Sequence, residues 1–317
     1  MTDVFTFGEA MLRLSVRPGE TLETAPAFDV HVAGTEANVA ASLARLGRSV
    51  MWASRLPDGP LGRRAIGELR RAGVDTSAVV LVPGGRMGTY FVELLAEPLA
   101  TRVIYDRAGS AAAGCTTEDV PWTALDRARI VHLSGITPAL SGSCRDIVLE
   151  MARRARTGGA LLSVDVNYRA KLWTPEAASG FLPQILEGAD VLVCTSEDAR
   201  DLFELNGDTE EVAREMAKRF DAKRGVITAG TEGAYWWQGD STGRAHPSPV
   251  SVVDRVGAGD AFAAGVLDGL LDDDFELGVR RGIALAAMAL TTRGDQAIVS
   301  RSELEAFLAG EGRRLDR

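Results

Sequence analysis

The second half of the chain alternates short apolar runs with longer amphipathic segments, and this rhythm limits the possible folds more than any other feature. Strands that alternate with helices of this length form parallel sheets covered by helices on both faces. The sequence therefore predicts an α/β fold with a doubly wound, mostly parallel sheet. The expected strands are 130–133, 161–166, 191–194 and 226–229, and the expected helices are 145–156, 175–186 and 210–220.

Two segments near the N-terminus do not follow this rhythm. Residues 11–32 contain two runs that alternate apolar and polar side chains, and residues 86–110 contain two strands of a hairpin with no helix between them. Such alternation is typical of a half-exposed antiparallel sheet. We expect both segments to form a small second sheet, a lid, on a single domain that spans residues 1–317, because no linker or repeat divides the chain.

Polar and glycine-rich residues follow several of the expected strands. In doubly wound sheets the ligand lies beyond the carboxyl ends of the strands, so these residues are predicted to face one crevice. They are residues 34–38, 165–169, 196–198, 230–233 and 257–260.

The segment 252–265 combines the features of an anion site. Pro249 to Val253 is interpreted as the end of a strand, Gly257 and Gly259 as a tight turn, and residues 261–271 as a buried helix. Glycines leave successive N–H groups bare at the positive end of a helix, where anions bind. Asp260 lies beside them, and two roles stay open from the residues alone: an ordinary helix cap, or a base that takes a proton from a hydroxyl.

Composition excludes several classes of partner and site. A formal net charge of −9 argues against a nucleic-acid or anionic-membrane surface. The apolar run 283–290 is shorter than the ~20 residues that a membrane helix needs. Cys115, Cys144 and Cys194 are widely spaced, which gives neither a disulfide framework nor a zinc motif. With no signal-peptide pattern, a cytoplasmic protein is expected.

Two motifs resemble those of the ribokinase-like (PfkB) carbohydrate kinases. They are Ala33-Gly34-Thr35-Glu36-Ala37-Asn38-Val39-Ala40 and Val253-Asp254-Arg255-Val256-Gly257-Ala258-Gly259-Asp260-Ala261-Phe262. Their order and separation match the family along nearly the whole chain. Within it, the segments 132–140 and 165–169, followed by Leu172-Trp173, are similar to those of 2-keto-3-deoxygluconate kinases.

The resemblance implies ATP-dependent phosphorylation of the 6-hydroxyl of 2-keto-3-deoxygluconate, with Mg²⁺. It makes Asp260 the catalytic base and the amides of Gly257, Ala258 and Gly259 the anion hole. Kinases for 5-keto-2-deoxygluconate, 2-keto-3-deoxygalactonate or fructose remain alternatives, as does a sugar-binding regulator without activity.

The resemblance also implies two further sets of contacts. A small-molecule sugar acid is favoured because arginine grips carboxylates in a bidentate fork. The residues expected to bind the sugar are Gly34, Asn38, Tyr90, Tyr105, Arg107, Arg169 and Asp260. The residues expected to bind the nucleotide are Asn167, Thr228, Gly230, Thr231, Gly233, Gly257 and Gly259.

Four positions depart from the family pattern. Arg13 replaces a common acidic residue, which makes it either a further cation for a carboxylate or a solvated charge. Ala199 replaces the usual magnesium-shell glutamate, so the metal ligands stay open, with Glu197 or Asp198 as substitutes. Ile283 replaces an asparagine near the adenine, and Arg255 puts activation by a monovalent cation in doubt. We also expect a homodimer through an apolar lid face that includes Phe28, Val30, Val32, Phe91 and Ile104, or a higher homo-oligomer.

Overall fold

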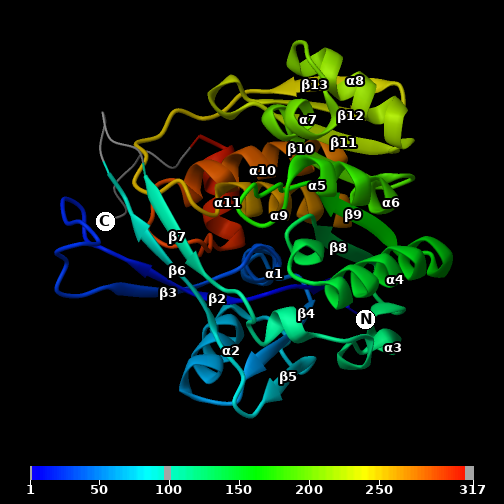
Figure 1. Cartoon of the computed structure of the whole chain (residues 1–317). Helices are drawn as coiled ribbons and strands as arrows, with labels where there is room; N and C mark the ends of the chain where they lie inside the picture. Colours follow the sequence, from blue (N-terminus) through cyan, green and yellow to red (C-terminus); the bar gives the residue numbers. More distant parts are fainter. Residues whose placement is uncertain (1, 96–100, 311–317) are drawn as a thin grey trace.

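A computed structural model describes residues 2–95 and 101–310 (Figure 1). Residues 1 and 311–317 of the expected domain, and residues 96–100 of the expected lid, lie outside this range. In the described part, nine strands form the large sheet in the order β13-β12-β11-β10-β9-β8-β1-β4-β5. These strands are β1 (Val4–Phe7), β4 (Val50–Pro57), β5 (Val79–Val82), β8 (Ile130–Ser134), β9 (Leu161–Asp165), β10 (Val191–Thr195), β11 (Arg224–Thr228), β12 (Ala234–Gln238) and β13 (Ser241–Ala245).

The large sheet is parallel from β11 to β5 and antiparallel only where β12 and β13 pair at one edge. Its helices are α1 (Thr35–Arg45), α2 (Pro60–Ala72), α3 (Trp122–Leu125), α4 (Gly142–Gly158), α5 (Pro175–Phe181), α6 (Pro183–Leu186), α7 (Ser196–Phe203), α8 (Thr209–Phe220), α9 (Ala258–Leu271), α10 (Phe275–Ala289) and α11 (Arg301–Leu308). The doubly wound fold predicted from the strand-helix rhythm is confirmed. The expected helix 175–186 is two helices, because Pro183 begins a new one.

The strands alternate their side chains between two buried cores. In β10, Val191 and Val193 belong to the core beneath α1, α2, α9 and α10, whereas Leu192 and Cys194 belong to the core beneath α4 to α8. This alternation follows from the two-residue period of a strand. It explains why the sheet is buried on both faces.

Among the described helices, none is long and apolar enough to cross a membrane.

The small sheet consists of β2 (Met11–Ser15), β3 (Asp29–Ala33), β6 (Gly88–Glu93) and β7 (Arg102–Asp106), in the order β3-β2-β6-β7. It projects to one side of the large sheet (Figure 1). β2 pairs in parallel with β6, so the two predicted segments meet through their inner strands.

The apolar surface of the small sheet differs in part from the expectation. Phe28 is 39% exposed and Ile104 is 49% exposed, but Val32 is buried at 1% because it packs into the core with Leu12. The prediction that Val32 belongs to an exposed face is therefore wrong. The dimer itself stays a prediction.

The strand expected at 249–253 does not form. Pro247 and Pro249 lack N–H donors, and the amide of Val253 donates instead to the carbonyl of Leu290 at the end of α10. Val252 and Val253 are each 48% exposed. An irregular segment, rather than a strand, therefore leads into the glycine turn.

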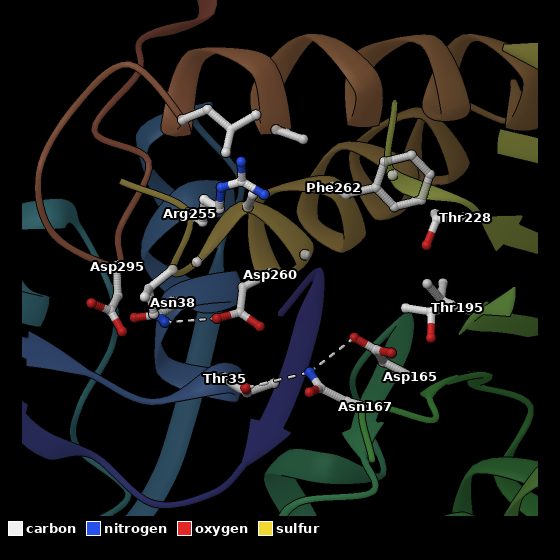
Figure 2. Close-up of a pocket in the computed structure, with 18 of the residues that line it drawn as sticks. Thr35, Asn38, Asp165, Asn167, Thr195, Thr228, Arg255, Asp260, Phe262 and Asp295 are labelled. Atoms are coloured by element: carbon white, nitrogen blue, oxygen red, sulfur yellow. Dashed lines mark hydrogen bonds between the residues drawn. The ribbon is translucent and has the colours of Figure 1, made fainter. Parts of the chain in front are cut away.

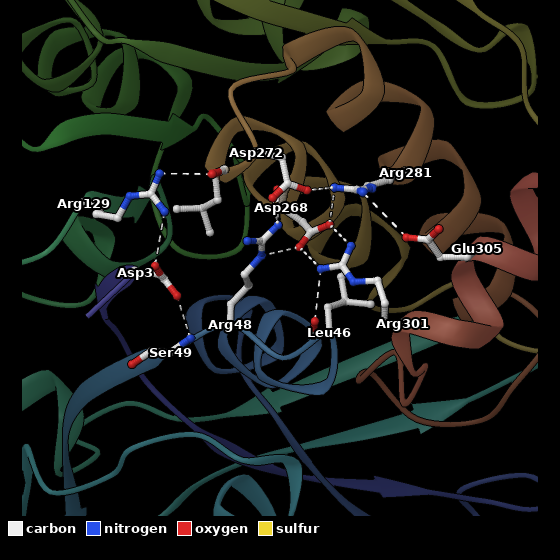
Figure 3. A network of polar contacts seen from close by, with 11 residues as sticks. Asp3, Leu46, Arg48, Ser49, Arg129, Asp268, Asp272, Arg281, Arg301 and Glu305 are labelled. Atoms are coloured by element: carbon white, nitrogen blue, oxygen red, sulfur yellow. Dashed lines mark hydrogen bonds and ion pairs between the residues drawn. The ribbon is translucent and has the colours of Figure 1, made fainter. Parts of the chain in front are cut away.

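A charged cluster holds the C-terminal half of α9 to its neighbours (Figure 3). The carboxylate of Asp268 is fully buried and accepts hydrogen bonds from Arg48 and Arg301, and Arg281 lies 2.9 Å away. These arginines come from the loop after α1, from α10 and from α11. The cluster thereby fixes the helix whose N-terminus faces the cavity described next.

Candidate active site

One cavity of about 1150 Å³ lies between the small sheet, the carboxyl ends of β9 to β11 and the N-terminus of α9. Every residue that the sequence analysis assigned to sugar, nucleotide or anion lines this cavity. They are Gly34, Asn38, Tyr90, Tyr105, Arg107, Asn167, Arg169, Thr228, Gly230, Thr231, Gly233, Gly257, Ala258, Gly259 and Asp260. The fold therefore brings together segments that are far apart in the sequence.

The anion turn, Gly257 to Gly259, forms the N-cap and the first residues of α9. Gly257 has φ +87°, and a Cβ added there would lie 2.0 Å from the carbonyl oxygen of Asp295, so only glycine fits. α9 begins at Ala258 without a side-chain cap. Its first N–H groups are thus free to face an anion, and the helix dipole adds to their attraction.

Asp260 is the buried acid of the site (Figure 2). It lies in the first turn of α9 and is only 7% exposed. Nδ2 of Asn38 donates to its Oδ2 at 2.7 Å. Burial raises its pKa to about 7, although the Asn38 hydrogen bond and the charge of Arg169 act in the opposite direction. A carboxyl group with this pKa exchanges protons readily near neutral pH.

Asp165, at the end of β9, is a second buried carboxyl group in the cavity. Burial, together with the charges of Asp260 and Asp198, raises its pKa to about 8. Nδ2 of Asn167 donates to Asp165 at 3.2 Å and to Oγ1 of Thr35 at 3.4 Å (Figure 2). Asn167 has φ +37°, a backbone conformation that asparagine tolerates better than most residues.

The structure separates the two candidate metal ligands. Asp198 is buried and lines the cavity, whereas Glu197 is exposed and does not. No group of three or more His, Cys, Asp or Glu side chains among residues 2–95 and 101–310 is arranged to hold a metal. Mg²⁺ commonly takes only one or two carboxylates besides water and phosphate oxygens, and Asp198 with Asp165 fits that donor set.

Aromatic and cationic side chains line the small-sheet side of the cavity. The rings of Tyr90 and Tyr105 stack at 5.5 Å between centroids, and the Lys171 ammonium lies 5.7 Å from the Tyr105 ring. The Arg107 guanidinium forms an ion pair with Glu9, which occupies part of its donor set. Arg169, in contrast, is exposed and forms no ion pair with the described residues. It is the better placed of the two arginines for an incoming carboxylate.

Arg13 takes neither of the two roles expected for it. It is 1% exposed, does not line the cavity, and pairs with Asp254 at 2.5 Å and Asp295 at 2.7 Å. Both the ligand-binding and the solvated interpretation are therefore wrong. The partners lie 241 and 282 residues along the chain, which explains why the sequence pattern did not indicate them.

Several other residues of the cavity wall are outside the predicted sets of sugar and nucleotide contacts. Arg255 is exposed and forms no ion pair in the described part of the chain. Its position two residues before Gly257 was the available signal. Asp295, Glu9 and Thr195 also line the cavity, and Ile283 contributes apolar surface.

Comparison with known proteins agrees with this geometry. The model of the pfkB family of carbohydrate kinases matches residues 1–301. The chain is 39% identical to a 2-dehydro-3-deoxygalactonokinase from Haloferax volcanii, with 99% of each chain covered. The crystal structure of a 2-dehydro-3-deoxygluconokinase from Thermotoga maritima is 34% identical, with a TM-score of 0.90 and coverage of 98% of this chain and 100% of that one. A fructokinase from Xylella fastidiosa, solved with bound ATP, is 25% identical, with a TM-score of 0.85 and coverage of 98% and 99%.

The large parallel sheet, the separate small sheet and the cavity between them define the ribokinase-like class of kinase folds. The chain belongs to the pfkB family of carbohydrate kinases. It is accordingly a phosphotransferase that acts on a sugar.

Proposed function

We propose that this protein transfers a phosphoryl group from ATP to the 6-hydroxyl of 2-keto-3-deoxygluconate. The galactonate epimer is the second candidate, because the Haloferax volcanii relative is named for it. The observation that carries the proposal is the position of Asp260 and the anion turn on one cavity wall. The chain acts as one kinase domain in this proposal, and the small sheet serves as its lid.

Asp260 is proposed to be the general base. Asn38 donates to its Oδ2, and Thr35 is a further side-chain hydrogen-bond partner of this carboxyl group. The sugar hydroxyl is proposed to donate to Oδ1. As the hydroxyl oxygen bonds to phosphorus and the bond to the ADP oxygen breaks, the hydroxyl proton passes to Asp260. A sugar hydroxyl is a poor nucleophile, so its alignment and a nearby acceptor for its proton govern the rate.

The anion turn is proposed to stabilise the charge that develops on the transferring group. The start of α9 has no side-chain cap, so its amides are proposed to donate to that group, and the loss of one such donor typically costs ~10²–10³ in rate. Arg255, exposed on the same wall, provides a cation next to the turn. Mg²⁺ neutralises phosphate charge when bound, and Asp165 and Asp198 are the residues proposed to hold it.

A sugar acid is favoured over a neutral hexose by the charge on the substrate side. Arg169 lines the cavity without a carboxylate partner among the described residues and lies close enough to lower the pKa of Asp260. A keto-acid substrate supplies the missing carboxylate, and its hydroxyl end then points to Asp260. Fructose carries no carboxylate and leaves the Arg169 donors without a charged acceptor.

A coupled ADP-release assay over separate acceptors tests the proposal. We expect the highest kcat/KM with 2-keto-3-deoxygluconate or 2-keto-3-deoxygalactonate, and a much lower value with fructose, which carries no carboxylate. NMR of the product should place the phosphate on the 6-oxygen. A preference for fructose would contradict the proposal, and turnover of no acceptor would favour a sugar-binding regulator.

A further inference from the structure

A buried charged cluster joins the small sheet to the segments that carry the anion turn. The Arg13 cluster consists of Arg13, Asp254, Asp295 and Tyr90. Arg13 lies on β2 and Tyr90 on the neighbouring β6, whereas Asp254 precedes the anion turn and Asp295 follows α10. All four residues are at most 5% exposed.

The guanidinium of Arg13 is shared between the two carboxylates. It donates to Oδ2 of Asp254 at 2.5 Å and to Oδ1 of Asp295 at 2.7 Å. The Tyr90 hydroxyl donates to the other oxygen of Asp295. Arg13 is thus the cation between two buried acids. Burial raises the pKa of Asp295, and the charge of Arg13 acts in the opposite direction.

The two carboxylates in turn hold the backbone around the anion turn. Oδ1 of Asp254 accepts the amide of Val256 at 3.1 Å, and its Oδ2 accepts the amide of Gly294 at 3.3 Å. The carbonyl of Asp295 lies directly against Gly257. Arg13 therefore contacts both carboxylates that hold the anion turn, Asp254 and Asp295, although it does not line the cavity itself.

We propose that Arg13 is a positioning residue that couples the small sheet to the anion turn, so that the turn has its catalytic geometry only while the small sheet supplies this cation. Without Arg13, two buried carboxylates face each other uncompensated and separate the segments that carry Val256 and Gly294. The effect falls on the transition state rather than on sugar binding. This inference rests on the proposed function of the turn.

The test compares Arg13→Ala with Arg86→Met in the full chain. Arg86 lies just before β6, the strand that pairs with β2, but forms an exposed pair with Asp106, so it is the matched control. We expect kcat of Arg13→Ala to fall about 10²-fold, as for a displacement of about 1 Å, with the KM of the sugar little changed. Arg86→Met should keep wild-type kinetics.

Chemical rescue separates positioning from general loss of structure. Guanidinium chloride at concentrations that do not unfold the protein should restore part of the activity of Arg13→Ala, whereas tetramethylammonium chloride at equal ionic strength should not. Arg13→Lys keeps the charge but not the planar fork, so an intermediate kcat is expected. If Arg13→Ala does not fold, a reduced kcat of Arg13→Lys supports the inference and a wild-type kcat overturns it.

Hydrogen exchange gives a readout that needs no substrate. Exchange of the amides in 254–262 should accelerate in Arg13→Ala and return toward wild type with guanidinium. Equal acceleration along the chain, or unchanged kcat and exchange, would overturn the inference. If the wild type phosphorylates no sugar, the proposed function fails, and the exchange measurement still decides the role of Arg13.

Discussion

Asn38 on α1 and Asp260 on α9 are joined by a hydrogen bond of 2.7 Å across the floor of the cavity. The amide of Asn38 fixes one carboxylate oxygen, so the orientation of the other is set by helix packing rather than by solvent. α1 and α9 pack against each other, and Asp268 at the far end of α9 keeps Arg48 beside α1 in place. The base is therefore held by rigid elements.

Asp260→Asn should reduce kcat by at least about 10²-fold, the lower end of what general base catalysis contributes. Asparagine keeps the size of the side chain and one acceptor oxygen for the Asn38 amide, but it cannot accept the hydroxyl proton. Binding of ATP and of the sugar acid, measured by calorimetry, should remain within severalfold of wild type. Asp240→Asn on an exposed turn is the control. Unchanged turnover in Asp260→Asn would exclude Asp260 as the base.

The pH dependence of kcat/KM should report the pKa of Asp260. Its raised pKa of about 7 means that the group is protonated, and inactive as a base, below that pH. kcat/KM should consequently rise about tenfold per unit up to about pH 7 and then level off, whereas an ordinary aspartate would give a flat profile over this range. Arg169→Met should shift the half-point upward, since the charge of Arg169 lowers this pKa. A half-point below pH 5 would contradict the assignment.

Local patterns in the sequence predicted the sheet and the segments at its carboxyl ends, whereas the contacts of individual residues with sugar and nucleotide came from the family resemblance. Strand and helix periods identified the parallel sheet, and the rule that ligands lie at the carboxyl ends of strands brought Asp165 to Arg169 and Gly257 to Asp260 to one place. The edge strands β12 and β13 interrupt that rhythm as an antiparallel hairpin, and the sequence analysis did not include them.

What the sequence did not indicate depends on contacts between distant residues. Arg13 alternates with apolar neighbours on β2, so its pattern is that of a solvent-facing side chain. Its burial follows only from the two acids that meet it from the end of the chain. The same holds for Arg107, whose partner Glu9 is 98 residues away. Pairing of charges across a fold has no local signature.

Arg169→Met should raise the KM of the keto-acid substrate about 10- to 100-fold, because a charge-assisted hydrogen bond is worth ~1.5–3 kcal/mol. Measurement at pH 8.5 keeps Asp260 ionised, so kcat should change little. The control is Arg200→Met, since Arg200 lies exposed on α7 and, within residues 2–95 and 101–310, pairs with Asp201 alone. An unchanged KM would remove Arg169 from the substrate site.

Asp268→Asn should lower the free energy of unfolding by about 3–5 kcal/mol, as expected when one partner of a buried ion pair is removed. Asp268 is fully buried among three arginines, and asparagine removes the carboxylate that all three share and that is the partner of Arg301 among the described residues (Figure 3). Denaturation by urea measures the change. Asp272→Asn is the matched control, because Asp272 pairs with two of the same arginines but is 38% exposed, and it should cost at most about 1 kcal/mol. Equal losses in the free energy of unfolding of the two variants would show that burial does not determine how much each carboxylate stabilises the protein.

Gly257→Ala should lose both stability and activity, whereas Gly259→Ala should lose activity alone. A Cβ on Gly257 meets the Asp295 carbonyl and forces a positive φ on alanine, so this variant should lose stability by at least about 1 kcal/mol together with activity. A Cβ on Gly259 meets no atom within 4 Å, so that variant should unfold like wild type. Its methyl group nevertheless enters the space beside the free amides, and kcat should fall about 10²–10³-fold, as for a lost anion-hole donor. Thermal unfolding and steady-state kinetics on both variants separate the two effects. Full activity in Gly259→Ala would mean that the phosphoryl group does not approach this turn.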